Sequence, residues 1–222
     1  MDSVLLSDFA KEIKGKSKVV DLGTGTGIIP ILLSAKTEAE KIVGIEIQEK
    51  MVELAKRNVE LNNLNNKIEI INEDIKNIKN NMEKEIFDVV ITNPPYKKDN
   101  TGLKNIHEGK LIARHEIKCN LEDIILASKF LLKNNGELFM VHRPERLVDI
   151  IFLLRKYKIE PKVIKFIFPK ANKEPNLVLI KGIKNAKPFL KIEKPLYIYK
   201  EDGTYSDEVL KIYNKKGEEN EG

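Results

Sequence analysis

Short apolar runs alternate with segments of helical period along most of this chain, and that alternation limits the folds it can adopt. The predicted strands span Lys18–Leu22, Lys41–Glu46, Lys67–Ile71, Phe87–Thr92, Gly136–His142, Val163–Phe168 and Asn176–Lys181. The predicted helices span Ser3–Ile13, Ile28–Ala35, Lys50–Leu61, Leu121–Leu132 and Glu145–Tyr157. Almost continuously apolar strands alternating with helices are typical of a parallel sheet covered on both faces. We therefore expect an α/β fold with seven strands, mostly parallel.

The last two predicted strands are joined by the short stretch FPKANKEPN, which has no room for a crossover helix. That connection predicts an antiparallel hairpin at one edge of the sheet. At 222 residues we expect one domain over 1–184, an extension over 185–213 packed on it, and a flexible tail over 214–222. The polar stretch 97–120 follows a strand and is long enough to be a functional loop.

Composition excludes several classes of protein. No apolar run reaches the length of a membrane-spanning helix, and the N-terminus lacks the features of a signal peptide. The single cysteine, Cys119, rules out a disulfide within the chain and a cysteine-based zinc site, and we expect no metal. A reducing, cytoplasmic setting fits this composition. The formal charge of +5 is compatible with a nucleic-acid partner but is weak evidence for one.

A glycine-rich turn, DLGTGTG, follows the first predicted strand and enters a helix. Glycines allow a sharp turn and let a ligand approach the main chain, while the helix directs its first N–H groups toward that ligand. The dinucleotide fingerprint requires glycines at relative positions one, three and six, but the sixth position here is Ile28. That departure argues against a nicotinamide cofactor. The candidate cofactor-binding residues of the turn are Asp21, Gly23, Thr24, Gly25 and Gly27.

Acidic residues follow the second and third predicted strands, where a nucleoside ligand would need them. Glu46 ends the second strand and can accept hydrogen bonds from two ribose hydroxyls. The alternative is an ordinary charged residue at a strand end. Asp74 can accept from an adenine amino group, or it can cap the helix that begins near Ile75. Ile47, next to Glu46, and Ile75 complete this set of candidates.

The fourth predicted strand ends in Asn93-Pro94-Pro95-Tyr96. Two consecutive prolines cannot continue a central strand, so the chain must leave the sheet at Asn93 as a rigid turn. The Asn93 side-chain oxygen and the Pro94 carbonyl can both accept hydrogen bonds from a planar amino group, and Tyr96 can stack on the attached ring. These four residues are the candidate catalytic residues, with Asn93 also touching the cofactor and Tyr96 the substrate. A purely structural turn is the alternative.

Together these motifs resemble those of the class I S-adenosylmethionine-dependent methyltransferases that methylate amino groups, which have a Rossmann-like fold. The closer resemblance is to the bacterial tRNA1(Val) adenine-37 N6-methyltransferases, and it covers essentially the whole chain. It is carried by DSVLLSDF at 2–9, ARHE at 113–116 and PLYIYKEDGTYSDEVLKIY at 195–213. Family members usually begin further upstream, and the resemblance implies that such a segment would complete the cofactor pocket near its methionine end.

The resemblance implies S-adenosylmethionine as cofactor, the anticodon loop of a tRNA as partner, and methyl transfer to N6 of adenine 37. It also implies that Arg114 contacts phosphate or sugar and that His115 shapes the substrate pocket. Surface charges on a helical turn are the alternative for these two residues. Nothing in the sequence indicates the oligomeric state.

Other functions remain open. Protein glutamine N5-methyltransferases also use NPPY, but they typically carry an N-terminal helical domain for which this chain has no room. Guanine-N2 ribosomal RNA methyltransferases usually have another residue in place of Tyr96. A non-catalytic RNA-binding module with the same fold is the alternative outside the enzymes, and a nicotinamide oxidoreductase is the least favoured.

Overall fold

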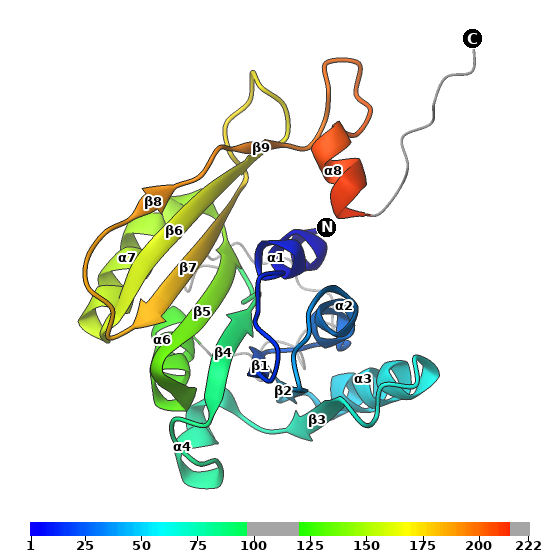
Figure 1. The fold of residues 1–222 in the computed structure, drawn as a ribbon, viewed down its shortest axis with the longest axis vertical. Coiled ribbons are helices and arrows are strands. Elements are labelled where there is room, and N and C mark those ends of the chain that lie inside the picture. The colour runs from blue at the N-terminus through cyan, green and yellow to red at the C-terminus, as the bar shows by residue number, and fades with distance from the viewer. Residues whose placement is uncertain (97–119, 214–222) are drawn as a thin grey trace, which may run out of the picture.

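A computed structural model describes residues 1–96 and 120–213 (Figure 1). The strands are β1 (Lys18–Leu22), β2 (Lys41–Glu46), β3 (Ile68–Asn72), β4 (Phe87–Thr92), β5 (Leu132–His142), β6 (Ile159–Phe168), β7 (Leu177–Lys184), β8 (Lys191–Ile192) and β9 (Leu196–Tyr197). The helices are α1 (Asp2–Phe9), α2 (Ile28–Lys36), α3 (Glu49–Leu61), α4 (Ile78–Asn81), α6 (Leu121–Leu131), α7 (Leu147–Lys156) and α8 (Asp207–Ile212), with 3-10 turns η1 (Ile75–Asn77) and η3 (Pro144–Arg146). Each predicted strand and helix has a counterpart.

All the strands belong to one sheet, in the order β3-β2-β1-β4-β5-β7-β6. Strands β1 to β5 are mutually parallel, and β7 lies antiparallel between β5 and β6. This confirms the predicted mostly parallel sheet with its antiparallel pair. The short strands β8 and β9 extend it by pairing with β6. The strand order reverses between β1 and β4, and in open α/β sheets ligands bind at the carboxyl ends of the strands at such a point.

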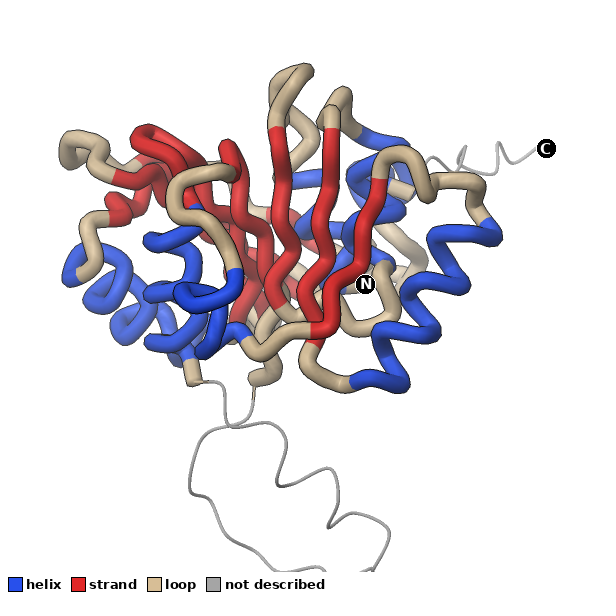
Figure 2. Tube along the Cα trace, turned by 90° about the horizontal axis from the view of Figure 1, so that it is seen from below, coloured by secondary structure: helices blue, strands red, loops and turns tan. Residues whose placement is uncertain are grey.

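Helices cover both faces of the sheet, as Figure 2 shows. Alternate residues of one strand enter different cores because side chains point to opposite faces. Val19 belongs to a core that also holds residues of α1, α2, α3 and α8, whereas the adjacent Val20 belongs to a core that holds residues of α4, α6 and α7. Both valines are fully buried. Burial on both faces explains why the central strands are so continuously apolar.

The first helix is shorter than the predicted Ser3–Ile13, because α1 ends at Phe9. Ile13 is buried in the same core as α1, and β1 begins at Lys18. Residues 10–12 form a turn instead of continuing the helix. The short elements α4 and α8 were not predicted, since neither is long enough to show a helical period, whereas η1 matches the short helix considered after Asp74.

The segment after β7 lies against the rest of the protein through strands β8 and β9 and helix α8. Val209 and Ile212 of α8 are buried in the core that includes α1, and Lys36 Nζ donates to the Ile212 carbonyl at 2.9 Å. The division into a domain over 1–184 and an extension over 185–213 stays a prediction. The expected flexible tail, 214–222, and most of the long loop lie outside the described residues.

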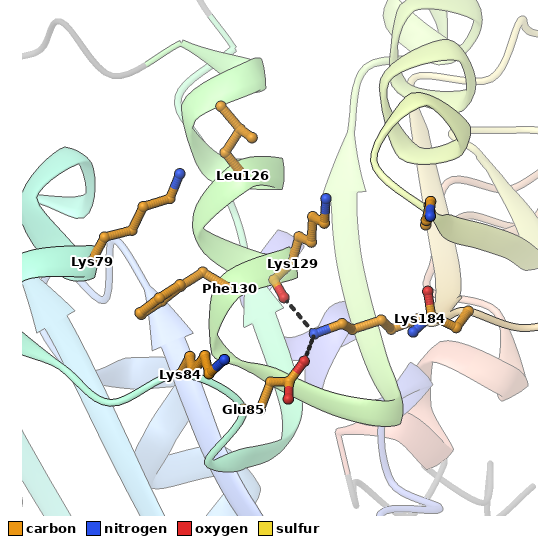
Figure 3. Close-up of a pocket in the computed structure, with 9 residues that line it drawn as sticks. Lys79, Lys84, Glu85, Leu126, Lys129, Phe130 and Lys184 are labelled. Atoms are coloured by element: carbon orange, nitrogen blue, oxygen red, sulfur yellow. Dashed lines mark hydrogen bonds and ion pairs between the residues drawn. The ribbon is translucent and has the colours of Figure 1, made fainter.

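Lys184 is a buried cation at the end of β7, on the edge of the sheet opposite the carboxyl ends of β1 and β4 (Figure 3). Its Nζ donates to the carbonyls of Lys129 and Leu132, at 2.8 and 2.7 Å, and to Glu85 Oε1 at 2.9 Å. These bonds satisfy carbonyl groups at the end of α6 and the start of β5. Lys184 also lines a pocket, together with Lys79, Lys84 and Lys129, which the same view labels.

Lys184→Ala is expected to lower the free energy of unfolding by roughly 2–4 kcal/mol, because it leaves buried carbonyls without donors. Urea denaturation measures the change. Lys129→Ala is the matched control, since the Lys129 ammonium only lies over the Tyr157 ring, 5.9 Å from its centroid. Equal losses in the two variants would show that the hydrogen bonds of Lys184 do not contribute to the free energy of unfolding.

Candidate functional site

The glycine turn opens at the carboxyl end of β1. Gly23, Gly25 and Gly27 have φ of 76°, 55° and 78°, a conformation that other residues rarely adopt. A Cβ added at Gly23 or Gly25 would meet no atom within 4 Å, so space lies open above both residues. Gly27 is the N-cap of α2. The turn therefore presents main chain and a helix N-terminus to an open space, as a bound ligand requires.

Glu46 is held beside this turn and is only 6% exposed. Its Oε2 accepts from the Gly25 N–H and its Oε1 from the Gln48 N–H, both at 2.9 Å. Each carboxylate oxygen has two acceptor positions, so both keep one for a further donor. The sequence did not indicate that Glu46 also ties β2 to the glycine turn.

Asp21 lies fully buried in β1, directly beneath the turn. Neither of its carboxylate oxygens has a hydrogen-bond partner among the described residues, and the same holds for the buried Thr24 hydroxyl. Burial raises the pKa of Asp21 to about 7, and the nearby Glu46 carboxylate adds to the rise. Unsatisfied buried polar atoms are costly, so their presence in this turn points to an absent ligand.

The residues after β2 and β3 lie near the same edge of the sheet, because Glu46 and Asn72 are register partners. Asp74 caps η1 by accepting from the Lys76 N–H at 2.9 Å through Oδ1. The alternative role considered for Asp74, a helix cap, is therefore present, and its second oxygen is left for a ligand. Ile47 is 42% exposed, so an apolar side chain faces solvent beside Glu46. Ile75 is half-buried.

The Asn-Pro-Pro-Tyr turn begins where β4 ends, next to the glycine turn. Leu22 of β1 and Thr92 of β4 are register partners, and the buried Thr92 hydroxyl donates to the Leu22 carbonyl at 2.9 Å. Asn93 follows at once and is half-buried, as is Tyr96, while Pro94 is buried and Pro95 is exposed. The structure thus places the two motifs predicted to hold cofactor and substrate side by side.

Tyr96 has four neighbours that sequence reasoning did not assign to it. Its hydroxyl lies 2.8 Å from Asp2 Oδ2 and 2.8 Å from Asn93 Oδ1. The Arg143 guanidinium lies over the ring, 5.1 Å from its centroid, and the His142 ring makes an edge contact at 5.3 Å. His142 ends β5 and Arg143 follows it, so the pairing of β5 with β4, which the sequence analysis did not predict, is what brings both residues to Tyr96.

His142 is neutral in this setting. Burial lowers its pKa, and the positive charge of Arg146 lowers it further. Its Nδ1 accepts from the Arg143 backbone N–H at 2.8 Å, so the ring proton sits on Nε2. The buried His142 ring packs against Tyr96 at one side of the site.

Two of the predicted site residues, Arg114 and His115, lie outside the described residues. Among residues 1–96 and 120–213, no group of three or more His, Cys, Asp or Glu side chains is arranged to hold a metal ion. No helix within those same ranges is long and apolar enough to cross a membrane.

The strand order, the glycine turn with its buried acids and the adjoining Asn-Pro-Pro-Tyr turn define the class of this protein: it has the class I S-adenosylmethionine-dependent methyltransferase fold. Residues 2–156 match the model of the methyltransferase small domain, and the chain belongs to that family. A crystal structure of a predicted O-methyltransferase from Agrobacterium tumefaciens has the same fold, with a TM-score of 0.77, 23% identity and 96% coverage of both chains.

Curated relatives share a more specific name. The tRNA1(Val) (adenine(37)-N6)-methyltransferase of Porphyromonas gingivalis is 28% identical over 183 residues, which are 80% of this chain and 71% of the relative. The protein of that name from Tolumonas auensis is 26% identical over 220 residues, covering 95% of this chain and 86% of the relative. The chain is thus a methyltransferase, and its cofactor is S-adenosylmethionine.

The described residues fit that cofactor. The open space above Gly23 and Gly25 admits a ligand to the main chain, and the buried, unpartnered Asp21 suits its positive charges. Glu46 retains acceptor positions for ribose hydroxyls. When bound, S-adenosylmethionine supplies a methyl group made electrophilic by its sulfonium centre.

Proposed function

We propose that this chain methylates the N6 amino group of an adenine in the anticodon loop of a tRNA, at position 37 of a tRNA1(Val)-like substrate, in the cytoplasm. The observation that carries the proposal is the position of Asn93. It leaves β4 beside the glycine turn, and Thr92 ties the ends of β4 and β1 together. The names of the curated relatives support the choice of tRNA adenine.

We assign the cofactor to the residues around the glycine turn. Main-chain groups of the turn would contact its methionine part, Glu46 its ribose hydroxyls, and Asp74 its adenine amino group, with Ile47 and Ile75 against the adenine ring. The assigned set is Asp21, Gly23, Thr24, Gly25, Gly27, Glu46, Ile47, Asp74, Ile75 and Asn93.

The work of the catalytic turn is to hold the amino group and direct its lone pair. Asn93 Oδ1 and the Pro94 carbonyl accept hydrogen bonds from its two N–H groups, which draws the nitrogen lone pair out of conjugation with the ring. Pro95 keeps the turn rigid, and Tyr96 offers its ring to the base. No strong base is needed, because the methylated amino cation is acidic and loses its proton readily. Catalysis then rests on positioning and on fixed dipoles.

An adenine in an anticodon loop is already single-stranded, so placing it in the site costs little unstacking energy. Arg143 is exposed directly after β5 and lies over the Tyr96 ring, so it adds a positive charge beside the Asn-Pro-Pro-Tyr turn. The roles of Arg114 and His115 as substrate contacts stay predictions.

A transfer assay with labelled S-adenosylmethionine separates the alternatives. Unmodified tRNA(Val) and a release factor are offered as separate acceptors, and a transcript with adenine 37 changed to guanine is the matched control. We expect label on tRNA(Val) and none on the control transcript. Label on the release factor alone would instead assign glutamine methylation, and cofactor binding without transfer to either would favour the non-catalytic RNA-binding module.

Asp21 is expected to lose its proton when the cationic cofactor binds. Its pKa is raised to about 7 in the free protein, so the carboxyl group is mostly protonated below that pH. Positive charges nearby favour the carboxylate, and cofactor affinity should therefore increase between pH 5 and 7, by up to about tenfold per pH unit. Calorimetry in buffers of different ionisation enthalpy measures the released proton. Asp21→Asn should abolish both the slope and the release, and persistence of either would contradict this role.

A further inference from the structure

The Tyr96 hydroxyl lies between two oxygen acceptors but has only one proton to donate. Asp2 Oδ2 and Asn93 Oδ1 are both 2.8 Å from it. If the hydroxyl donated to Asn93, it would take one of the two acceptor positions of the oxygen that the proposed mechanism needs, and it would hold that oxygen toward Tyr96 rather than toward the substrate amino group. Which acceptor takes the proton therefore matters for catalysis.

We propose that Asp2 is a positioning residue that takes the Tyr96 proton and so keeps Asn93 Oδ1 available for the substrate. A carboxylate is a stronger acceptor than an amide oxygen, so Tyr96 donates to Asp2. The Tyr96 oxygen is then an acceptor, and a half-turn of the Asn93 amide lets Nδ2 donate to it. That rotation points Oδ1 away from Tyr96. The inference rests on the proposed role of Asn93.

The surroundings hold Asp2 and Tyr96 in this arrangement. Asp2 begins α1, whose Leu5 and Leu6 are 1% and 0% exposed, so the helix that carries the carboxylate is firmly anchored. Helix α1 packs against α2, β5 and α8. Burial raises the pKa of Tyr96 far above its usual range, and its hydrogen bond to Asp2 raises it further, so the hydroxyl keeps its proton.

Removing the charge of Asp2 should allow the Tyr96 hydroxyl to donate to Asn93 instead. In Asp2→Asn the side chain has nearly the same shape, but its amide is a weaker acceptor and can also present N–H groups to Tyr96. The Tyr96 proton then shifts toward Asn93 Oδ1 and competes with the substrate. We expect kcat to fall by roughly 10- to 100-fold, the equivalent of one charge-assisted hydrogen bond. The KM for S-adenosylmethionine should change little, because Asp2 acts through Tyr96 rather than through the cofactor.

A double-mutant cycle tests the inference with four proteins: wild type, Asp2→Asn, Tyr96→Phe and the double variant. If Asp2 acts through the Tyr96 hydroxyl, the double variant should turn over no more slowly than Tyr96→Phe alone. Asp8→Asn, on the same helix, is the matched control and should leave kcat unchanged, since within residues 1–96 and 120–213 Asp8 pairs with Lys11 and Lys36 rather than with Tyr96. Thermal unfolding and cofactor binding confirm that each variant is folded, and Asp2→Ala provides a second loss of the carboxylate.

Full kcat in Asp2→Asn and Asp2→Ala, or effects of Asp2 and Tyr96 that simply multiply, would overturn the inference. The cycle compares rates on whichever acceptor the wild type methylates. Failure of the tRNA proposal would therefore appear as a different acceptor for the wild type, whereas failure of this inference would appear only in the ratios among the variants.

Discussion

Asn93→Ala is expected to lower kcat by roughly 10²–10³-fold, the usual effect of removing one preorganised hydrogen-bonding group from an active site. The physical reason is that alanine has no side-chain oxygen to accept from the substrate amino group, which then keeps its lone pair in conjugation. Single-turnover transfer with saturating S-adenosylmethionine and tRNA measures the chemical step. Cofactor affinity should change far less, because Asn93 is one of ten residues that we assign to the cofactor.

Asn62→Ala is the matched control for this variant. Asn62 lies exposed at the end of α3, where its side chain donates only to the Asn58 carbonyl. Its removal should leave turnover unchanged. If Asn93→Ala transferred the methyl group at the rate of wild type, the proposed mechanism would be wrong, since that mechanism assigns the side-chain acceptor of the amino group to Asn93.

Glu46→Gln is expected to weaken S-adenosylmethionine binding by at least about 100-fold, a loss close to that of one or two charge-assisted hydrogen bonds. Two effects combine. The amide loses the charge that strengthens bonds to ribose hydroxyls, and it cannot accept at both positions from the Gly25 and Gln48 N–H groups. The glycine turn then loses its attachment to β2. Calorimetric titration with S-adenosylmethionine gives the affinity.

Glu69→Gln provides the comparison for that loss of charge. Glu69 lies on β3, beside Val43 of β2, and its exposed carboxylate pairs with Lys41 on the surface. A surface ion pair contributes little to stability, so this variant should bind the cofactor like wild type. Equal weakening in the two variants would show that the effect of Glu46 is one of net charge, not of contact.

The sheet could be predicted because its determinants are local. Val19 and Val20 enter opposite cores, so the strand is apolar at consecutive positions and is recognisable without knowledge of its neighbours. The lengths of β6 and β7 were underestimated, since Ile159–Pro161 and Gly182–Lys184 become strand only by pairing with each other. The two-residue strands β8 and β9 likewise exist only because β6 offers them an edge.

The candidate site likewise has one part that the sequence predicts and another part that depends on tertiary packing. The glycine turn, Glu46 and Asn93 stand next to predicted strand ends, and their proximity follows from strand order alone. The contact between Tyr96 and Asp2 does not follow from strand order, because Asp2 is 94 residues away in sequence and reaches Tyr96 through the packing of α1. The buried, unpartnered state of Asp21 also required the structure, since exposure and partners depend on tertiary packing.

The identity of the methylated nucleoside tests the central claim most directly. Unmodified tRNA(Val) is incubated with the protein and S-adenosylmethionine, digested to nucleosides and examined by mass spectrometry against authentic standards. The account predicts N6-methyladenosine, about one per tRNA, lost when adenine 37 is replaced and lost in Asn93→Ala. N2-methylguanosine, a ring-nitrogen product, or N6-methyladenosine formed equally by the Asn93→Ala variant would contradict it.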